Sequence, residues 1–373
     1  MPEPRTLRGA GGLLAAALSL PALQLAHAEA VPDAGTLSLK YLSYQDSQPG
    51  ADRIRVTTPA LAIMVPFADA WSLDASHVVD TISGASPAYH TEALTKMHDR
   101  RRATDLALTH YADTGTVTLG TSYSSESDYI SRGLNLAATR ASEDQNTTWS
   151  GAVNLLHDSI NPSNRIVFDE HKNVADLSLG LTQVLTMRDL VQLVAGYSHG
   201  NGYFSDPYKI FDNRPRTRNH LTLLGRWNHH LEASGGTARL SYRYYDDSFK
   251  IRAHTFTADY VQPFGEGWTI TPLARYYSQS AASFYVDLDP AAAPFPTNPP
   301  PDARYFTEEQ RLSAYGAVTL GAKLAKQIDA NWSVDLKAER YRQRASWMLG
   351  GAGSPNLAPF SAVTYQLGLA RRF

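Results

Sequence analysis

Residues 332–339 read Trp-Ser-Val-Asp-Leu-Lys-Ala-Glu, so that apolar and polar side chains alternate at every step. A β-strand sends successive side chains to opposite faces, and this segment would therefore have one apolar and one polar face. Similar alternation occupies segments that begin near Thr116, Thr148, Ala175 and Thr237. The pattern predicts an all-β protein.

Strand length and loop spacing favour a membrane barrel over a soluble β-sandwich, which also alternates. Many alternating segments run for about 10 to 13 residues, longer than the usual ~5 to 6 and suited to a tilted membrane strand. Short polar turns at 112–115, 186–189 and 327–330 alternate with longer loops, as in outer-membrane barrels. The longer loops are predicted at 83–103, 158–172, 200–217, 280–310 and 344–359. We therefore predict a transmembrane, antiparallel, up-and-down β-barrel of the outer-membrane type.

The barrel is predicted to have about 16 strands, within a range of about 14 to 18. An even number of strands places both termini in the periplasm. The second strand contains Pro59, which cannot donate to the sheet, so a bulge or a shorter strand is expected there. The predicted strands begin near residues 36, 53, 71, 104, 115, 132, 146, 174, 189, 218, 237, 250, 267, 311, 331 and 360.

The aromatic residues provide an independent indication of a membrane barrel. Amphipathic rings prefer the membrane–water interface, so two girdles are expected. On this trace only Trp347 lies in an outer loop, and the other tryptophans form a periplasmic girdle: Trp71, Trp149, Trp227, Trp268 and Trp332. Tyrosines gather toward the opposite strand ends: Tyr44, Tyr123, Tyr197, Tyr244, Tyr276 and Tyr341.

The first 28 residues are predicted to be a cleaved secretory signal peptide. Arg5 and Arg8 give a positive start, residues 12–25 are apolar, and Ala26-His27-Ala28 matches a cleavage site that ends at Ala28, with Ala30 as a near alternative. Beyond this segment no run approaches the ~20 apolar residues of a membrane helix. We expect residues 29–373 to form one barrel domain in the cell outer membrane.

Composition excludes several classes of function. The chain of 373 residues carries a formal charge of -2, without the basic excess of nucleic-acid-binding proteins. It has no cysteine. Thiol catalysis, disulfides, iron–sulfur clusters and a lipidated cysteine are therefore excluded.

In residues 363–373 the odd positions through Leu369 are apolar, and the sequence stops on Phe373. This end resembles the signal that the barrel-assembly machinery recognises, with Tyr365, Gly368 and Phe373 as the assembly signal and Gln366 in a matching place. Arg371 departs from that pattern, where a hydrophobic residue is usual. Near the interface an arginine can extend its charged end into water, so the cost should be modest.

Three further stretches carry a family resemblance: DTISGASP at 80–87, NGYFSDPYK at 201–209 and RYYSQSAASFY at 275–285. Together they resemble an uncharacterised proteobacterial family of outer-membrane barrels, catalogued as domain of unknown function thirty-five-seventy. The resemblance implies an outer-membrane barrel. Members often occur alongside a periplasmic flavin transferase and small lipoproteins, which implies a periplasmic lipoprotein or redox partner. The alternative is that these turn-rich stretches only shape loops.

Charged side chains are predicted on the inner face of the barrel. Arg239, Arg243 and Arg275 would face inward, as would Asp335, Lys337 and Glu339. Opposed arginines and carboxylates would create a transverse field in an aqueous channel. The alternative is that these charges pair with one another and fill the lumen.

No catalytic, cofactor or metal site is expected. The adjacent His229 and His230 would point apart on a strand, and Asp287 and Asp289 are more simply solvated carboxylates than calcium ligands. The leading interpretation is a non-enzymatic porin-like passage or membrane scaffold in contact with outer-membrane lipid. The alternatives are a non-conducting platform for a redox partner and an outer-membrane barrel hydrolase.

The longest outer loop, 280–310, is expected to restrict the mouth of the barrel. Its proline-rich stretch 291–301 favours stiff, extended geometry, and Phe295 gives it an apolar reason to fold onto the rim. A surface tether is the alternative.

Overall fold

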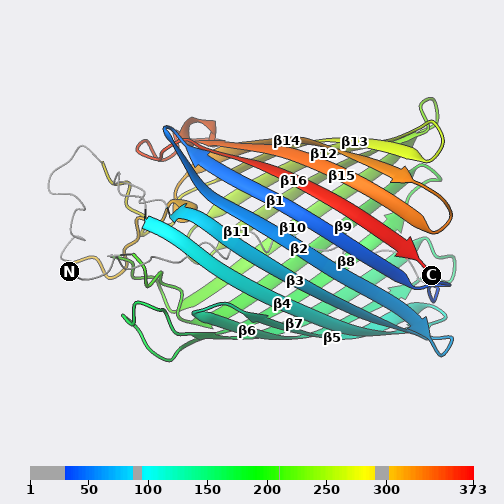
Figure 1. Cartoon of the computed structure of the whole chain (residues 1–373), viewed down its shortest axis with the longest axis horizontal. Coiled ribbons are helices and arrows are strands. Elements are labelled where there is room, and N and C mark those ends of the chain that lie inside the picture. Colours follow the sequence, from blue (N-terminus) through cyan, green and yellow to red (C-terminus); the bar gives the residue numbers. More distant parts are fainter. Residues whose placement is uncertain (1–29, 87–94, 210, 290–301) are drawn as a thin grey trace.

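The computed structural model describes residues 30–86, 95–209, 211–289 and 302–373. Its sixteen antiparallel strands form one closed barrel in which each strand pairs with its neighbours in sequence and β1 pairs with β16 (Figure 1). The strands are β1 Thr36–Gln48, β2 Ala51–Phe67, β3 Trp71–Ser86, β4 Thr95–Ala112, β5 Gly115–Ser125, β6 Tyr129–Ala141, β7 Thr147–Ile160, β8 Glu170–Val184, β9 Asp189–Gly202, β10 Thr217–Leu231, β11 Gly236–Asp247, β12 Arg252–Phe264, β13 Trp268–Gln279, β14 Tyr315–Gln327, β15 Trp332–Arg344 and β16 Phe360–Arg372.

The prediction of a sixteen-strand barrel is confirmed. The largest displacement of a strand start is in β4, which begins at Thr95 rather than near residue 104. The added part contains Asp99, Arg100, Arg101 and Arg102, whose continuous charge hides the period of two. Strand pairing to β3 holds this segment extended regardless of its composition.

Pro59 does not shorten its strand or shift its register, so that expectation was wrong. β2 runs through seventeen residues, and Pro59 lies opposite Tyr41 in a constant register. The register shift between β1 and β2 lies instead between Gln45 and Ser47, nearer the β1–β2 turn. Proline is tolerated because the β2–β3 pairing is interrupted only between Thr57 and Ala60 and then resumes unchanged.

The outer surface of the barrel is apolar. Strand register aligns Leu119, Leu136 and Val153 on one face, and Leu119 is 53% exposed. Leu179 on the same surface is 60% exposed. Burial of such side chains is the main driving force of folding in water, so a continuous band of exposed leucines fits contact with lipid.

The two ends of the barrel differ (Figure 1). Short turns and the C-terminus lie at one end, and longer segments between strands lie at the other. Bacterial barrels keep short turns in the periplasm and long loops outside the cell. Within the described residues, no helix has the length and apolar character needed to cross a membrane.

Candidate functional site

A wall of arginines lines one side of the lumen. Arg226 on β10 pairs in register with Ser241, Ser241 with Thr257, and Thr257 with Arg275 on β13. Arg239 and Arg243 flank Ser241 on β11, with side chains on the same face. These four residues define the basic wall, and all four side chains are exposed although they face away from the lipid side. Water therefore reaches the inner face of this wall.

Only one arginine of the basic wall has a carboxylate partner among the described residues. Arg239 forms an ion pair with Asp259, its register partner on β12. Arg226 donates a 2.9 Å hydrogen bond to the amide oxygen of Gln192, which carries no charge. The wall therefore keeps a net positive charge.

The predicted cluster on β15 does not oppose these arginines as a negative pole. Asp335, Lys337 and Glu339 do lie on the lumen side, but Asp335 lies 3.6 Å from Lys323, and Lys337 lies 3.0 Å from Glu339. The pairing alternative therefore describes this cluster. Gly368 leaves room for it, since a Cβ atom at that position would lie 2.3 Å from Asp335 Oδ2.

The negative pole lies on strands that the sequence did not single out. Asp74 on β3 and Asp105 on β4 face the lumen, and no ion pair joins either to a basic side chain in the described part of the chain. Ser76, the register partner of Asp105, donates a 3.1 Å hydrogen bond to its carboxylate. In a ring of sixteen, β3 and β4 lie opposite β11 and β12. An acidic wall therefore faces the basic wall across the lumen.

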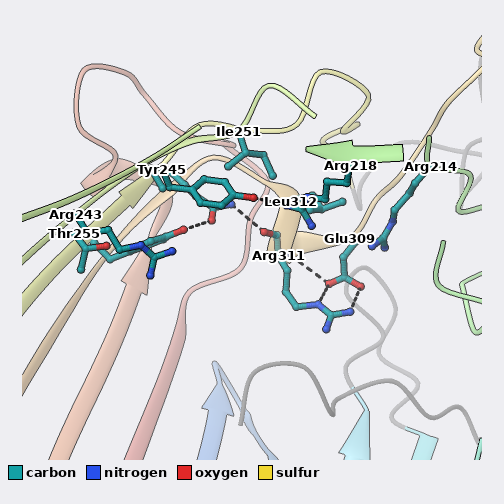
Figure 2. A pocket seen from close by; sticks show the side chains of 12 residues that line it. Arg214, Arg218, Arg243, Tyr245, Ile251, Thr255, Glu309, Arg311 and Leu312 are labelled. Atoms are coloured by element: carbon teal, nitrogen blue, oxygen red, sulfur yellow. Dashed lines mark hydrogen bonds and ion pairs between the residues drawn. The ribbon is translucent and has the colours of Figure 1, made fainter. Parts of the chain in front are cut away.

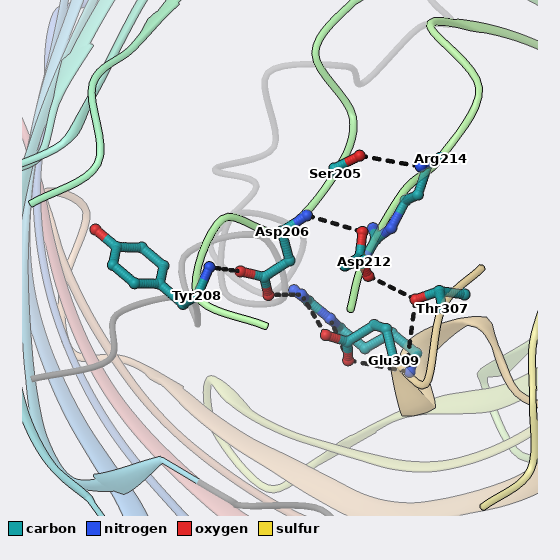
Figure 3. Close-up of polar contacts among 8 residues, drawn as sticks. Ser205, Asp206, Tyr208, Asp212, Arg214, Thr307 and Glu309 are labelled. Atoms are coloured by element: carbon teal, nitrogen blue, oxygen red, sulfur yellow. Dashed lines mark hydrogen bonds and ion pairs between the residues drawn. The ribbon is translucent and has the colours of Figure 1, made fainter. Parts of the chain in front are cut away.

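The described residues of two outer segments, 203–216 and 280–314, fold against each other inside the ring of strands (Figure 3). We call their described parts the cap. Asn213 and Phe306 exchange backbone hydrogen bonds of 2.8 and 2.9 Å, and Thr307 donates a 2.6 Å hydrogen bond to Asp212. The cap also reaches the β15–β16 loop, where Asn356 donates to Asp287. The outer segments thus form one connected structure.

Buried charges hold the cap together. Arg214 pairs with Asp212 at 2.7 Å, and Arg311 pairs with Glu309 at 3.0 Å and lies 3.8 Å from Asp206. Burial alone would raise the pKa of Glu309, but the neighbouring cations and the hydrogen bonds from Arg311 outweigh it and lower that pKa. Glu309 is therefore ionised and fixed to Arg311.

A small apolar cluster joins the cap to the turn between β11 and β12. Its buried members are Phe249, Ile251, Ala282 and Leu312. Below this cluster is a cavity of about 320 Å³ between the cap and the strands β10 to β13 (Figure 2). Arg214, Arg218, Arg243 and Arg311 all line it. The mouth of the barrel is thus narrowed on the side of the basic wall.

The expectation for loop 280–310 is met only in part by what the structure describes. Its flanks fold inward, as the contacts of Thr307 and Leu312 show. The proline-rich stretch 291–301 and Phe295 lie outside the described residues. Ala28 and the predicted signal peptide also lie outside them.

The predicted girdle lies toward the short-turn end, as do Gly368 and Phe373 of the assembly signal, whereas Tyr365 lies midway along β16. Trp71, Trp268 and Trp332 begin their strands, Trp149 is the third residue of β7, and Trp227 is near the end of β10. Arg371 is held over the Trp332 ring at 5.3 Å, which offsets its departure from an apolar pattern.

The chain end closes the barrel. Phe373 exchanges backbone hydrogen bonds of 2.8 and 3.0 Å with Gly35, and its ring lies against that glycine. Tyr365 points to the lipid side and is 57% exposed.

A serine, a histidine and an aspartate occupy adjacent strands, a feature that sequence reasoning missed. Ser198 pairs in register with His220, and His220 with Asp247, and Ser198 lies within Gly196-Tyr197-Ser198-His199-Gly200. A Gly-x-Ser-x-Gly motif forms a nucleophile elbow only where a strand turns into a helix. Here the motif lies within the continuous strand β9. No hydrogen bond joins these three described side chains, and Asp247 accepts from Arg218 and Tyr245 instead. The row therefore lacks the hydrogen bonds of a serine hydrolase triad.

Three carboxylates meet at the outer rim. Oxygens of Asp99, Glu126 and Asp128 lie within 4.8 Å of one another. Burial, followed by the repulsion of the two aspartates, raises the pKa of Glu126 to about 7. Tyr208 of the cap donates a hydrogen bond to Asp128, so this rim is also tied to the cap.

A closed barrel with an apolar outer surface, a charged aqueous lumen and inward-folded outer segments is an outer-membrane β-barrel. The family model described as "Protein of unknown function (DUF3570)" matches residues 10–96, 88–169 and 163–364. The chain belongs to this family. No curated protein matches it.

Several solved structures match this chain over most of its length. A bacterial polysaccharide outer membrane secretin superposes with a TM-score of 0.52 at 7% identity, over 91% of this chain and 98% of that one. A BenF-like porin from Pseudomonas fluorescens Pf-5 gives 0.47 at 11% identity, over 92% and 100%. The siderophore receptor PirA from Pseudomonas aeruginosa gives 0.47 at 11% identity, over 91% of this chain but 62% of the receptor, so the chain spans less than two thirds of that protein. At such identity the likeness to the secretin concerns the fold alone.

Proposed function

We propose that the chain is a passive, non-enzymatic passage for small hydrophilic solutes across the outer membrane, narrowed at its outer mouth by the cap. The observation that carries this proposal is the solvent exposure of the four inward arginines of the basic wall. Leaving charges unpaired in a dry interior would cost several kcal/mol each, so their exposure fits a lumen filled with water.

The two opposed walls would make the passage selective among solutes. A positive wall on β10 to β13 and Asp74 and Asp105 on the far side create a field across the lumen. Such a field orients solutes that carry charge or a dipole and excludes apolar ones. The passage would therefore favour small polar solutes.

Liposome swelling tests the proposal. Vesicles containing the refolded protein should swell in isotonic arabinose faster than protein-free vesicles, and more slowly in the larger sugar raffinose. Equal rates in vesicles with and without protein would reject the passage.

A non-conducting scaffold is the second candidate. The apolar cluster between the cap and the β11–β12 turn, with Phe249 1% and Leu312 5% exposed, favours it because such packing would close the mouth. A scaffold predicts a folded protein that gives no swelling with either sugar.

A further inference from the structure

Four arginines line the cavity below the cap, and three of them form ion pairs with carboxylates. Arg214 is occupied by Asp212, Arg218 by Asp247 and Arg311 by Glu309. Arg243 has no hydrogen bond or ion pair with any described residue, and its guanidinium carbon lies 6.0 Å from the centre of the Tyr245 ring. One guanidinium group is therefore left over.

Arg243 lies where a ligand in the cavity could reach it, away from the carboxylate that holds Arg311. It lies beside Thr255 on one side of the cavity, whereas the Arg311–Glu309 pair lies on the other (Figure 2). Each of the other three arginines is held by a carboxylate at 3.0 Å or less. The fixed pairs leave Arg243 as the group able to accept an incoming anion.

Apart from Thr255 and Gln279, the rest of the lining is apolar and aromatic. Ile251, Ala253 and Leu312 line the cavity together with Tyr245 and Tyr277. Its volume of about 320 Å³ is near the lower end of the ~300 to 1,000 Å³ that small-molecule sites occupy. A ligand of this size would have one charged group and a body no larger than about one ring.

We propose that this cavity binds a small organic monocarboxylate, with the carboxylate on Arg243 and the apolar body against Ile251, Leu312 and the two tyrosines. Arginine recognises carboxylates through two parallel hydrogen bonds, which gives orientation as well as attraction. The site concerns binding and does not require that the barrel conducts.

Isothermal titration calorimetry on the folded, detergent-purified full-length protein tests the site. Benzoate supplies both the charge and the ring, benzamide supplies the ring without the charge, and phosphate supplies charge without a ring. We expect benzoate to bind wild type at least about tenfold more tightly than benzamide or phosphate. Absent benzoate binding, or an affinity for benzoate no higher than that for benzamide or for phosphate, would overturn the proposal.

Two charge-neutralising variants separate this site from a general effect of lumen charge. Arg243→Gln should weaken benzoate binding by at least about tenfold. Arg275→Gln removes an equal charge from the same basic wall outside the cavity lining, and should leave the affinity unchanged. Equal weakening by both variants would overturn the site, and gel mobility before and after heating checks that each is folded. Binding without solute flux would reject the passage alone, and flux without binding would reject the site alone.

Discussion

The guanidinium group of Arg311 holds both carboxylate oxygens of Glu309, with Nε 3.0 Å from Oε1 and Nη2 3.2 Å from Oε2. Glu309 is only 3% exposed, and Arg311 also approaches Asp206 on the other segment of the cap. This pair therefore links 280–314 to 203–216 at a buried point.

Replacing Glu309 should loosen the cap without unfolding the barrel. Glu309→Ala removes the ion pair and both hydrogen bonds that Glu309 makes with Arg311, at a cost of about 1 to 3 kcal/mol. Limited proteolysis of the folded protein should then cut the cap faster, with sites mapped by mass spectrometry. Glu266→Ala, in an exposed turn at the other end, is the matched control. Identical cleavage of the two variants would contradict the role of the pair.

The opposed walls predict selectivity changes of opposite sign. Arg226→Gln or Arg275→Gln should lower the anion-to-cation permeability ratio by about twofold, because positive charge is removed from the aqueous lumen. Asp74→Asn or Asp105→Asn should raise it by a similar factor. Reversal potentials under a salt gradient measure the ratio. A shift in the same direction for both sets would show that the walls do not act on the permeating ions.

The raised pKa of Glu126 at the outer rim predicts that the free energy of unfolding depends on pH. Its pKa of about 7 exceeds the ordinary value of 4.5, so between these values the folded state holds a proton that the unfolded state has released. Stability should therefore fall as pH rises from about 4.5 to 7, and Glu126→Gln should remove part of that fall. Urea unfolding at pH 5 and pH 8 measures the free energy of unfolding. If wild type and variant lose equal stability over that range, Glu126 is not the group responsible.

Deleting Phe373 should impair assembly, because the residue supplies two backbone hydrogen bonds that close β16 onto Gly35. We also propose that the barrel-assembly machinery recognises it. The folded, heat-modifiable fraction on unboiled gels from membranes should drop severalfold, whereas Phe373→Tyr should retain it. An unchanged fraction after deletion would place the signal elsewhere, for example at Tyr365.

The strands could be predicted from the alternating segments because successive residues of a strand point to opposite faces. Odd-numbered and even-numbered residues of one strand therefore lie on different sides of the barrel wall. Leu336 is 52% exposed on the lipid side, and its neighbours Asp335 and Lys337 pair inside, as the period of two requires. The ion pairs of the lumen depend on register between strands. β14 and β15 align Lys323 with Lys337, so Lys323 lies diagonally across from Asp335, which is two residues from Lys337 on the same face. The sequence of either strand alone does not contain this relationship.

The contacts within the cap could not be predicted because its segments have no period. Thr307 and Asp212 lie 95 residues apart in sequence, and nothing local indicates that they meet. Likewise, Asp74 and Asp105 appear as ordinary polar positions until closure of the ring places β3 and β4 opposite the arginines. From the sequence alone, the opposing charge is therefore expected on the strand that carries Asp335 and Glu339.

Single-channel recording in planar bilayers tests most directly the claim that the barrel is a water-filled passage narrowed by its cap. Wild type should give discrete conductance steps, and Glu309→Ala should give larger steps because the loosened cap no longer narrows the mouth. Steps of equal size would contradict the narrowing, and the absence of steps in both folded proteins would contradict the passage itself.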